Sequence, residues 1–422
     1  MKFNNAPKFL SNQKGSALVI TLFFVIIVAM LGAVISLRSS GEAWLSQGQA
    51  NSSYAFWVAE GGIQKAYWLI TKSDCVGLKN QGTSANCAAC ASCGPGNLAL
   101  SENFASGSYA VVISNGNKKL NSTGTYSPNS FLTTTRQIEV ILGSPPLFGY
   151  AAFSRGQMTF SNNAKVDSYN STQGAYGGTN VSSQGNIGTM SAGADAIVLN
   201  NNVTIKGSVT TGEGGGVQQG SGVTITGTVS DNNDRTLTVV TVPPELLSAA
   251  SLGPLTFSNG DTKNLSAGKY RYDSIGFANN GELVISGDVV LYLTSSPAIA
   301  AGNNNKVTIN TGGSLKIYTD GAIAFNNNVL LNNATQDPSK FSILSRYSGS
   351  DGVVISNNGN FYGTIYAPDA GVNVSNNAQV YGAIVGSAVN VSNNDQVHYD
   401  LALGAIDDTN AAPVLRNWRE VY

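Results

Sequence analysis

Very few residues in this chain have side chains that could carry acid–base or nucleophilic chemistry. The 422 residues include one histidine, His398, and 24 acidic residues. Histidine is the common general base near neutral pH and a frequent metal ligand, so one copy argues against a catalytic triad or a histidine-ligated metal. The acidic residues of the second half, such as Asp273, Glu282 and Asp320, follow no repeated spacing. The sequence therefore predicts no catalytic residue, no metal site and no cofactor.

The four cysteines are the other group of side chains that could bind a metal or form covalent bonds. Cys75 is followed by Cys87, Cys90 and Cys93, a spacing that would suit zinc or an iron–sulfur cluster in a reducing compartment. In an exported protein, an even number of cysteines instead indicates disulfides. We expect two disulfides that close a loop, with the three pairings left open.

The composition is typical of an exported β protein. Only 11% of the residues are charged, against about 25% in an ordinary soluble domain. The net charge of −1 provides no basic field for nucleic acid, so we expect none as a partner. The 48 glycines and the recurring asparagine pairs indicate many sharp turns.

The N-terminus carries the signals for location. Residues 1–15 include three lysines and no acid, and the next 22 residues, 16–37, are uncharged. This run is long enough to cross a hydrocarbon core of about 30 Å as a helix. The positive charge before it places the leader in the cytoplasm and the rest outside. The helical pattern continues to about residue 70, and the glycine pair Gly61-Gly62 marks either a kink or close packing.

Three interpretations of this segment compete. The apolar run is too long for an ordinary secretory signal, and residues 38–42 match a signal cleavage site poorly. A plain membrane anchor is the second interpretation. The third is processing before the apolar run, between Gly15 and Ser16.

A family resemblance supports the third interpretation. Residues 13–19, Gln-Lys-Gly-Ser-Ala-Leu-Val, resemble the class III leader junction of type IV pilins, and more narrowly the PilX N-terminal family of minor pilins. Residues 55–66 are similar to that family's AAEAGIxxA stretch. The resemblance implies that prepilin peptidase cleaves after Gly15 and that the new Ser16 amine is methylated. It also implies a single-pass inner-membrane protein, mainly periplasmic, which joins other pilins and the inner-membrane assembly machinery and then reaches the pilus at the cell surface.

One position departs from the pilin pattern. Most pilins have glutamate at the fifth mature residue, and Ile20 stands there in this chain. A buried carboxylate in a membrane needs a partner such as the terminal amine of a neighbouring subunit. A subunit without it cannot make that contact, which favours a minor, initiating subunit over a repeating shaft subunit.

A small β region follows the helix. Segments 108–113, 119–126 and 135–142 alternate in polarity as strands do. Together with the cysteine loop they occupy residues 71–146 and complete an α+β part. The run Gly143-Ser144-Pro145-Pro146 then marks a domain boundary.

The rest of the chain repeats a short phrase of a small polar residue, two asparagines and an alternating strand. Because asparagine and glycine tolerate left-handed backbone and stacked asparagines can bond to one another, we interpret the pairs as corners of a parallel β-helix rather than as a ligand surface. The asparagine runs are Asn162-Asn163, Asn200-Asn201-Asn202, Asn279-Asn280, Asn303-Asn304-Asn305, Asn326-Asn327-Asn328, Asn357-Asn358, Asn376-Asn377 and Asn393-Asn394.

We assign the β-helix to residues 147–422, with an excursion near 231–273 where the rhythm breaks. Residues 361–368 and 380–386 are two copies of one coil, 19 residues apart. This part resembles the β-helical C-terminal domain of PilX-type proteins, including the closing Trp418–Tyr422 phrase. We expect His398 to be a corner or capping residue.

The predicted fold is thus an α+β N-terminal part, with a long transmembrane helix and a small sheet, followed by an all-β right-handed parallel β-helix. The predicted function is a minor pilin and pilus assembly protein at or near the fibre tip, which initiates assembly or presents an adhesive β-helix to a surface or a glycan. The alternatives are a membrane-tethered envelope protein outside any pilus and, less favoured, a polysaccharide-acting enzyme.

Overall fold

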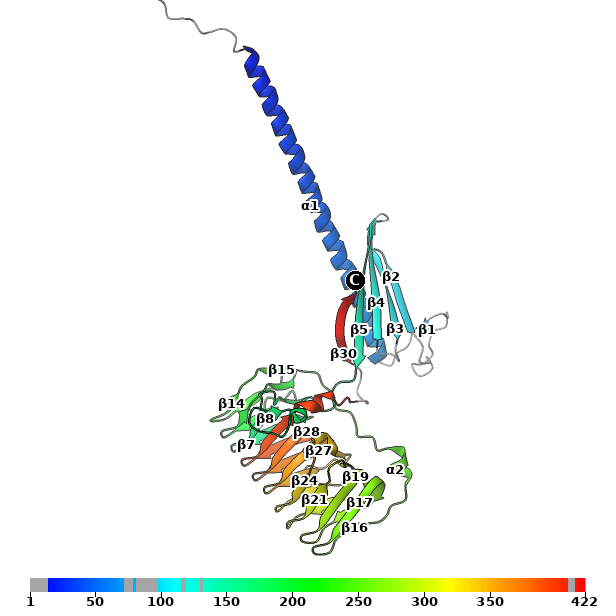
Figure 1. The fold of residues 1–422 in the computed structure, drawn as a ribbon, viewed down its shortest axis with the longest axis vertical. Coiled ribbons are helices and arrows are strands. Elements are labelled where there is room, and N and C mark those ends of the chain that lie inside the picture. Colours follow the sequence, from blue (N-terminus) through cyan, green and yellow to red (C-terminus); the bar gives the residue numbers. More distant parts are fainter. Residues whose placement is uncertain are drawn as a thin grey trace, which may run out of the picture. The chain divides into compact units, whose positions relative to one another are not determined.

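The computed structural model describes residues 14–71, 79–80, 98–114, 119–129, 132–408 and 414–421. The chain divides into two compact units, one of Met1–Gly143 with Pro413–Tyr422 and one of Ser144–Ala412 (Figure 1). The expected disulfide residues Cys75, Cys87, Cys90 and Cys93 all lie outside the described residues, so their pairing stays a prediction.

The first unit begins with one uninterrupted helix, α1 (Lys14–Thr71). Its large apolar side chains from Leu18 to Leu37 are all exposed, and an 18-residue window reaches a mean hydropathy of 3.1. This segment is long and apolar enough to anchor in a membrane, which confirms the predicted long apolar helix. Gly15 and Ser16 lie in its first turn, and their cleavage and methylation stay predictions.

The second half of α1 packs on an antiparallel sheet. Its buried residues recur every three or four positions, which places them on one face of the helix; they are Ala55, Ala59, Ile63, Ala66 and Leu69. They share a core with apolar side chains of the sheet such as Val111, Leu120 and Ile138. The strands are β1 (Lys79–Asn80), β2 (Leu98–Phe104), β3 (Gly107–Ser114), β4 (Lys119–Asn129), β5 (Leu132–Gly143) and β30 (Val414–Val421), adjacent in that order.

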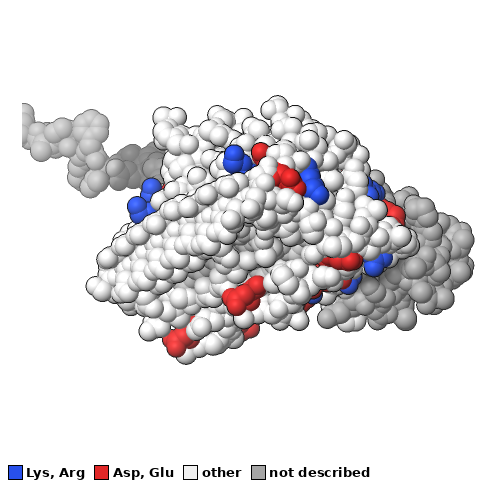
Figure 2. Space-filling view, turned by 90° about the horizontal axis from the view of Figure 1, so that it is seen from below, with Lys and Arg blue, Asp and Glu red and all other residues white. Residues whose placement is uncertain are grey.

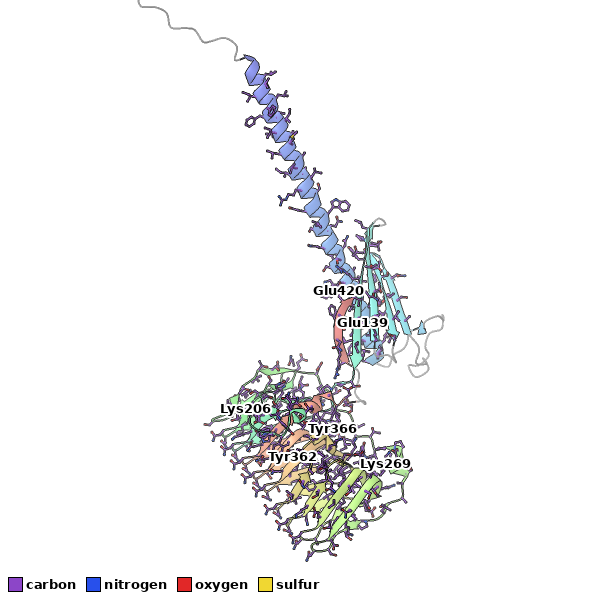
Figure 3. All side chains as sticks on the ribbon, in the orientation of Figure 1. Glu139, Lys206, Lys269, Tyr362, Tyr366 and Glu420 are labelled. Carbon is purple, nitrogen blue, oxygen red and sulfur yellow. The ribbon has the colours of Figure 1, made fainter. Side chains whose placement is uncertain are left out.

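Strand β30 follows the second unit in the sequence, near the C-terminus, and pairs antiparallel with β5 of the first unit (Figure 1). The assignment of residues 147–422 to the β-helix was therefore wrong at its end, because Pro413–Tyr422 belong to the first unit. The strand is held by polar contacts: Trp418 Nε1 donates to Glu60 Oε2 at 3.0 Å, and Arg419 Nη2 lies 2.6 Å from Glu139 Oε1. Glu139 and Glu420 are labelled in Figure 3. The second unit is thus an insertion between two neighbouring strands of the first.

The second unit is a parallel β-helix, as predicted. It also contains the short helices α2 (Pro244–Ser248), η2 (Ser171–Gln173), η3 (Pro338–Lys340) and η4 (Leu401–Ala405). Its strands are β6 (Ala152–Ser154), β7 (Met158–Ser161), β8 (Lys165–Tyr169), β9 (Ile187–Thr189), β10 (Ile197–Asn200), β11 (Thr204–Ile205), β12 (Val209–Gly212), β13 (Val217–Gln219), β14 (Thr224–Ile225), β15 (Val229–Asn233), β16 (Leu255–Thr256), β17 (Thr262–Tyr272), β18 (Ile275–Gly276), β19 (Glu282–Leu293), β20 (Ile299–Ala301), β21 (Lys306–Ile309), β22 (Ser314–Thr319), β23 (Ile323–Phe325), β24 (Leu330–Asn333), β25 (Phe341–Ser345), β26 (Val353–Ser356), β27 (Asn360–Ser375), β28 (Gln379–Ser392) and β29 (Gln396–Asp400).

The strands stack in register to form three faces around one apolar core. The first face contains β16, β18, β20, β23, β26, the ends of β27 and β28, β7, β10 and β13. The second face follows it in each coil and includes β19, β21, β29, β8 and β11, and the third includes β22, β25, β6, β9 and β12. Alternate residues point inward, so valine, isoleucine and phenylalanine of successive coils contact one another.

The coils do not stack in chain order. The first coil, β6–β8, pairs on one side with β28 and β29, the last strands of the β-helix, and on the other with β9–β11 (Figure 1). The chain runs outward from there to β15 and resumes at β16, at the opposite end of the stack. Residues 234–254, which include α2, connect the two ends. The predicted excursion at 231–273 was therefore too wide, since β15, β16 and β17 belong to coils.

This crossover segment is fixed along the third face. Leu246 is buried against Tyr292, and Lys269 Nζ lies 2.5 Å from Glu245 Oε1. Tyr366 donates from its hydroxyl to the Thr238 carbonyl oxygen at 2.8 Å. Lys269 and Tyr366 are labelled in Figure 3. The crossover covers apolar surface of this face and ties both halves of the stack together.

Candidate functional surface

The asparagine pairs form the corner between the first and second faces. Both members of most pairs have left-handed backbone, for example φ of 53° and 62° at Asn162 and Asn163 and 65° at both Asn393 and Asn394. Asparagine tolerates this region better than other residues with a Cβ atom. The prediction that these pairs turn corners is confirmed.

Along most of the corner the side-chain amides bond to one another. Asn162 Nδ2 donates to Asn393 Oδ1 at 2.9 Å, and Asn201 Nδ2 donates to Asn162 Oδ1 at 3.0 Å. A second row runs beside it, with Asn163 Nδ2 donating to Asn394 Oδ1 at 3.0 Å. This confirms the predicted ladder, which also crosses the junction between the first and last coils.

Beside the ladder, the first face presents a row of small or uncharged outward side chains. The row is continuous in register over ten strands and contains Thr256, Gly276, Ala300, Ala324, Val354, Asn373, Asn390, Thr159, Val198 and Gln218. None of the ten is charged. Figure 2 shows how widely the charged groups are spaced on one side of the described chain. This row was not predicted from the sequence, although eight of its ten members stand three residues before an asparagine pair.

A buried carboxylate lies just inside the corner. Asp395 is fully buried, and its oxygens accept from the backbone N–H groups of Ala378 at 2.8 Å and Ser392 at 3.0 Å. Burial raises the pKa of Asp395 to about 7, against the lowering effect of those hydrogen bonds. Ala378 and Ala164 occupy the same position in the adjacent coils, so alanine fits there.

This carboxyl predicts a pH-dependent stability. Its pKa is raised on folding, so its contribution to the free energy of unfolding is present below about pH 4 and is lost as pH rises through about 7. We expect the melting temperature of the β-helix to fall between pH 5 and pH 8 by at least about 3 °C more in the natural protein than in Asp395→Ala. Differential scanning calorimetry of both proteins checks this; parallel pH profiles would contradict it.

His398 is not a corner or capping residue, so that prediction was wrong. It lies in β29, is 1% exposed, and its Nδ1 is 2.6 Å from Asp167 Oδ1 on β8. The Tyr176 hydroxyl donates to Asp167 Oδ2 at 2.8 Å, and the Tyr176 ring lies 3.8 Å from the imidazole between centroids. These contacts join the last coil to the first coil.

The acidic residues of the β-helix are dispersed, and several are paired with neighbours. Asp320 Oδ1 lies 2.8 Å from Arg346 Nε, and Glu282 Oε1 accepts from the Thr308 hydroxyl at 2.7 Å. Among the described residues, no group of three histidine, cysteine or acidic side chains is placed to hold a metal ion.

Two open apolar grooves flank the second half of α1 in the first unit. One, of about 620 Å³, is lined by Trp44, Leu45 and Phe56 and by the polar pair Arg136 and Glu420. The other, of about 560 Å³, is lined by aromatic rings, those of Tyr54, Trp57, Phe104, Tyr109 and Tyr126. Large apolar side chains of α1 thus stay uncovered well beyond the 16–37 run.

One family model matches part of the chain, and solved structures are similar to it at low sequence identity. A family described as a domain of unknown function, DUF7305, matches residues 213–406. No curated protein matches the chain. An ice-binding protein from the Antarctic ascomycete Antarctomyces psychrotrophicus is similar over 60% of this chain and 96% of its own, with 12% identity and a TM-score of 0.27. The DUF3494 domain of a Shewanella frigidimarina ice-binding protein is similar over 61% of this chain and 98% of its own, with 18% identity and a TM-score of 0.26.

Proposed function

We propose that the protein is a minor subunit of a type IV pilus or a related fibre, which carries a β-helix on the cell surface. In this proposal residues 16–37 hold the chain in the inner membrane before assembly. Prepilin peptidase removes residues 1–15, Ser16 is methylated, and α1 then packs among the helices of other pilins.

The observation that carries the proposal is the division of α1 into two halves. The first half exposes apolar side chains on every side, such as Ile20 at 59% and Phe24 at 67%. The second half buries one face on the antiparallel sheet, while its other sides line open apolar grooves. A helix that only anchored a domain would need no uncovered aromatic groups above the membrane, whereas a helix packed in a fibre bundle would bury them.

Peptide mass spectrometry on sheared surface fibres, and on membranes of the same cells, tests this function. We expect a methylated peptide that begins at Ser16 in the fibre fraction. An intact form containing Met1 and confined to membranes would contradict the fibre proposal and leave the membrane-tethered alternative.

The uncharged row of the first face favours a second candidate function, adhesion to an ordered, uncharged solid such as ice. The strands that carry the row are hydrogen-bonded in register, and the row mixes methyl groups with amides and hydroxyls. Charged side chains would hold their own hydration water and interrupt such a contact.

Substitution of one residue of this row by lysine tests the second function independently of the first. If the row binds ice, Ala324→Lys abolishes thermal hysteresis of the full chain, because it places a long charged side chain in the middle of the face. Asn332→Lys, an outward position on the second face, is the matched control and leaves the activity unchanged. Absence of thermal hysteresis in the natural protein would exclude ice as the solid.

A further inference from the structure

Both rows of the asparagine ladder are interrupted in the coils that contain Asn279-Asn280 and Asn303-Asn304, and a groove lies there. Its volume is about 310 Å³, and it is lined by asparagines alone, namely Asn279, Asn280, Asn303, Asn304, Asn327 and Asn328. We propose that this groove binds a segment of a neutral polysaccharide. The proposal rests on the proposed surface function and names the class of ligand that the β-helix would hold.

The amides at the interruption have unused hydrogen-bonding capacity. In the described part of the chain, the ladder bonds begin at Asn327 and Asn328, whose Oδ1 atoms each accept from the next coil at 3.4 Å. The side chains of Asn279, Asn280, Asn303 and Asn304 make no hydrogen bond there. Each free amide offers two N–H donors and one carbonyl acceptor.

Asn305 holds the backbone of the corner beside the groove. It takes the position that Ala378 and Ala164 hold in other coils, and its side chain turns inward to accept from the Gly302 N–H at 2.9 Å and to donate to the Ala278 carbonyl oxygen. The corner at 302–305 also closes on itself, with the Asn305 N–H donating to the Gly302 carbonyl oxygen at 3.0 Å. These contacts fix the local backbone, so the corner at 302–305 does not depend on ladder bonds.

The chemistry of the groove selects a neutral, hydroxyl-rich ligand. Amides form hydrogen bonds with hydroxyl groups, because both kinds of group can donate and accept a hydrogen bond. On the second face the groove is flanked by Glu282 and Lys306, which are register neighbours of opposite charge, so no net charge favours an acidic polymer. The free amides repeat from coil to coil, which suits a chain of repeating units better than one isolated sugar.

The test uses the full chain in detergent micelles and ligand-observed saturation-transfer NMR, which detects weak binding. The probes are the neutral hexamers maltohexaose, cellohexaose and chitohexaose, with a hexamer of galacturonic acid as the acidic probe. We expect at least one neutral hexamer to receive saturation and the acidic hexamer to receive less. Loss of two amides in Asn280→Gly/Asn304→Gly should weaken binding about tenfold.

Glycine keeps the corner intact in this variant, since Asn280 and Asn304 have φ of 57° and 62° and Gly260 and Gly222 already serve the same corner in the end coils. The matched control is Asn163→Gly/Asn202→Gly, where the amides already bond within the ladder; it should leave binding within about twofold. No saturation of any neutral hexamer, equal loss in both variants, or preference for the acidic hexamer overturns the proposal. None of these outcomes depends on incorporation into a fibre, and failure to find the protein in fibres would not affect the groove.

Discussion

Substitution Gly124→Ala should separate α1 from the sheet of the first unit. A Cβ atom at Gly124 on β4 would lie closer than 3.0 Å to backbone atoms of Ala55 and Ala59 in α1. Backbone atoms of a packed helix cannot move aside as a flexible side chain can, so the clash must be relieved by moving the helix. Overpacking of this kind costs about 3 kcal/mol of the free energy of unfolding. Hydrogen–deuterium exchange should show faster exchange in β3, β4 and residues 50–71, with the β-helix unchanged.

The same added methyl group at Gly61 provides the matched control. Gly61 is exposed on α1, and a Cβ atom there would meet nothing within 4 Å. Alanine favours helix over glycine by about 1 kcal/mol, so Gly61→Ala should stabilise α1 slightly. If both variants exchanged like the natural protein, the close approach of helix and sheet at Gly124 would not exist in solution.

The glycine pair Gly61-Gly62 in the same region shows what a local sequence pattern can and cannot predict. The alternatives at Gly61-Gly62 were a kink or close packing. α1 is uninterrupted there, and a Cβ atom on the buried Gly62 would meet the Ser122 hydroxyl and the Tyr109 ring, so close packing was the correct one. The small residues Ala55, Ala59 and Ala66 belong to the same buried face. Their small size lets the helix approach the sheet closely. The periodicity in the sequence indicates the buried face but not how closely that face packs.

The β-helix was predictable because its signals are local. A corner needs left-handed backbone, and paired asparagines before alternating strands recur wherever a coil turns. The 19-residue offset between residues 361 and 380 is also the offset of their strands in register. Each such feature involves residues within one coil or two successive coils.

The order of the coils was not predictable, because it depends on contacts between distant segments. Residues 158–161 and 389–392 are register neighbours, although more than 200 positions separate them. The two segments carry similar phrases, but so does every other coil, and similarity among repeats does not say which of them touch. The contact of His398 with Asp167 is specific to this junction, and one histidine in a sequence gives no indication of its partner.

Deletion of residues 413–422 should destabilise the first unit and leave the β-helix folded. It removes strand β30 from the edge of β5 and separates Arg419 from Glu139, which would retain Lys119 at 2.5 Å as its ion-pair partner. It also removes the contact between the Trp418 and Phe56 rings, whose centroids lie 5.4 Å apart, and the hydrogen bond from the Trp418 N–H to Glu60. We expect exchange in β5 and residues 50–71 to accelerate about 100-fold, equivalent to about 3 kcal/mol of local stability.

Replacement of the same ten residues by glycine and serine is the control for chain length, and it should behave like the deletion because it also lacks the side chains and the strand propensity. Exchange in β8, β28 and β29 should stay at the natural rate in both proteins, since these strands pair with one another and not with β30. Faster exchange in the β-helix with an unchanged β5 would mean that the C-terminal segment belongs to the β-helix after all. Faster exchange confined to the first unit would establish that a strand encoded after the β-helix completes the sheet encoded before it.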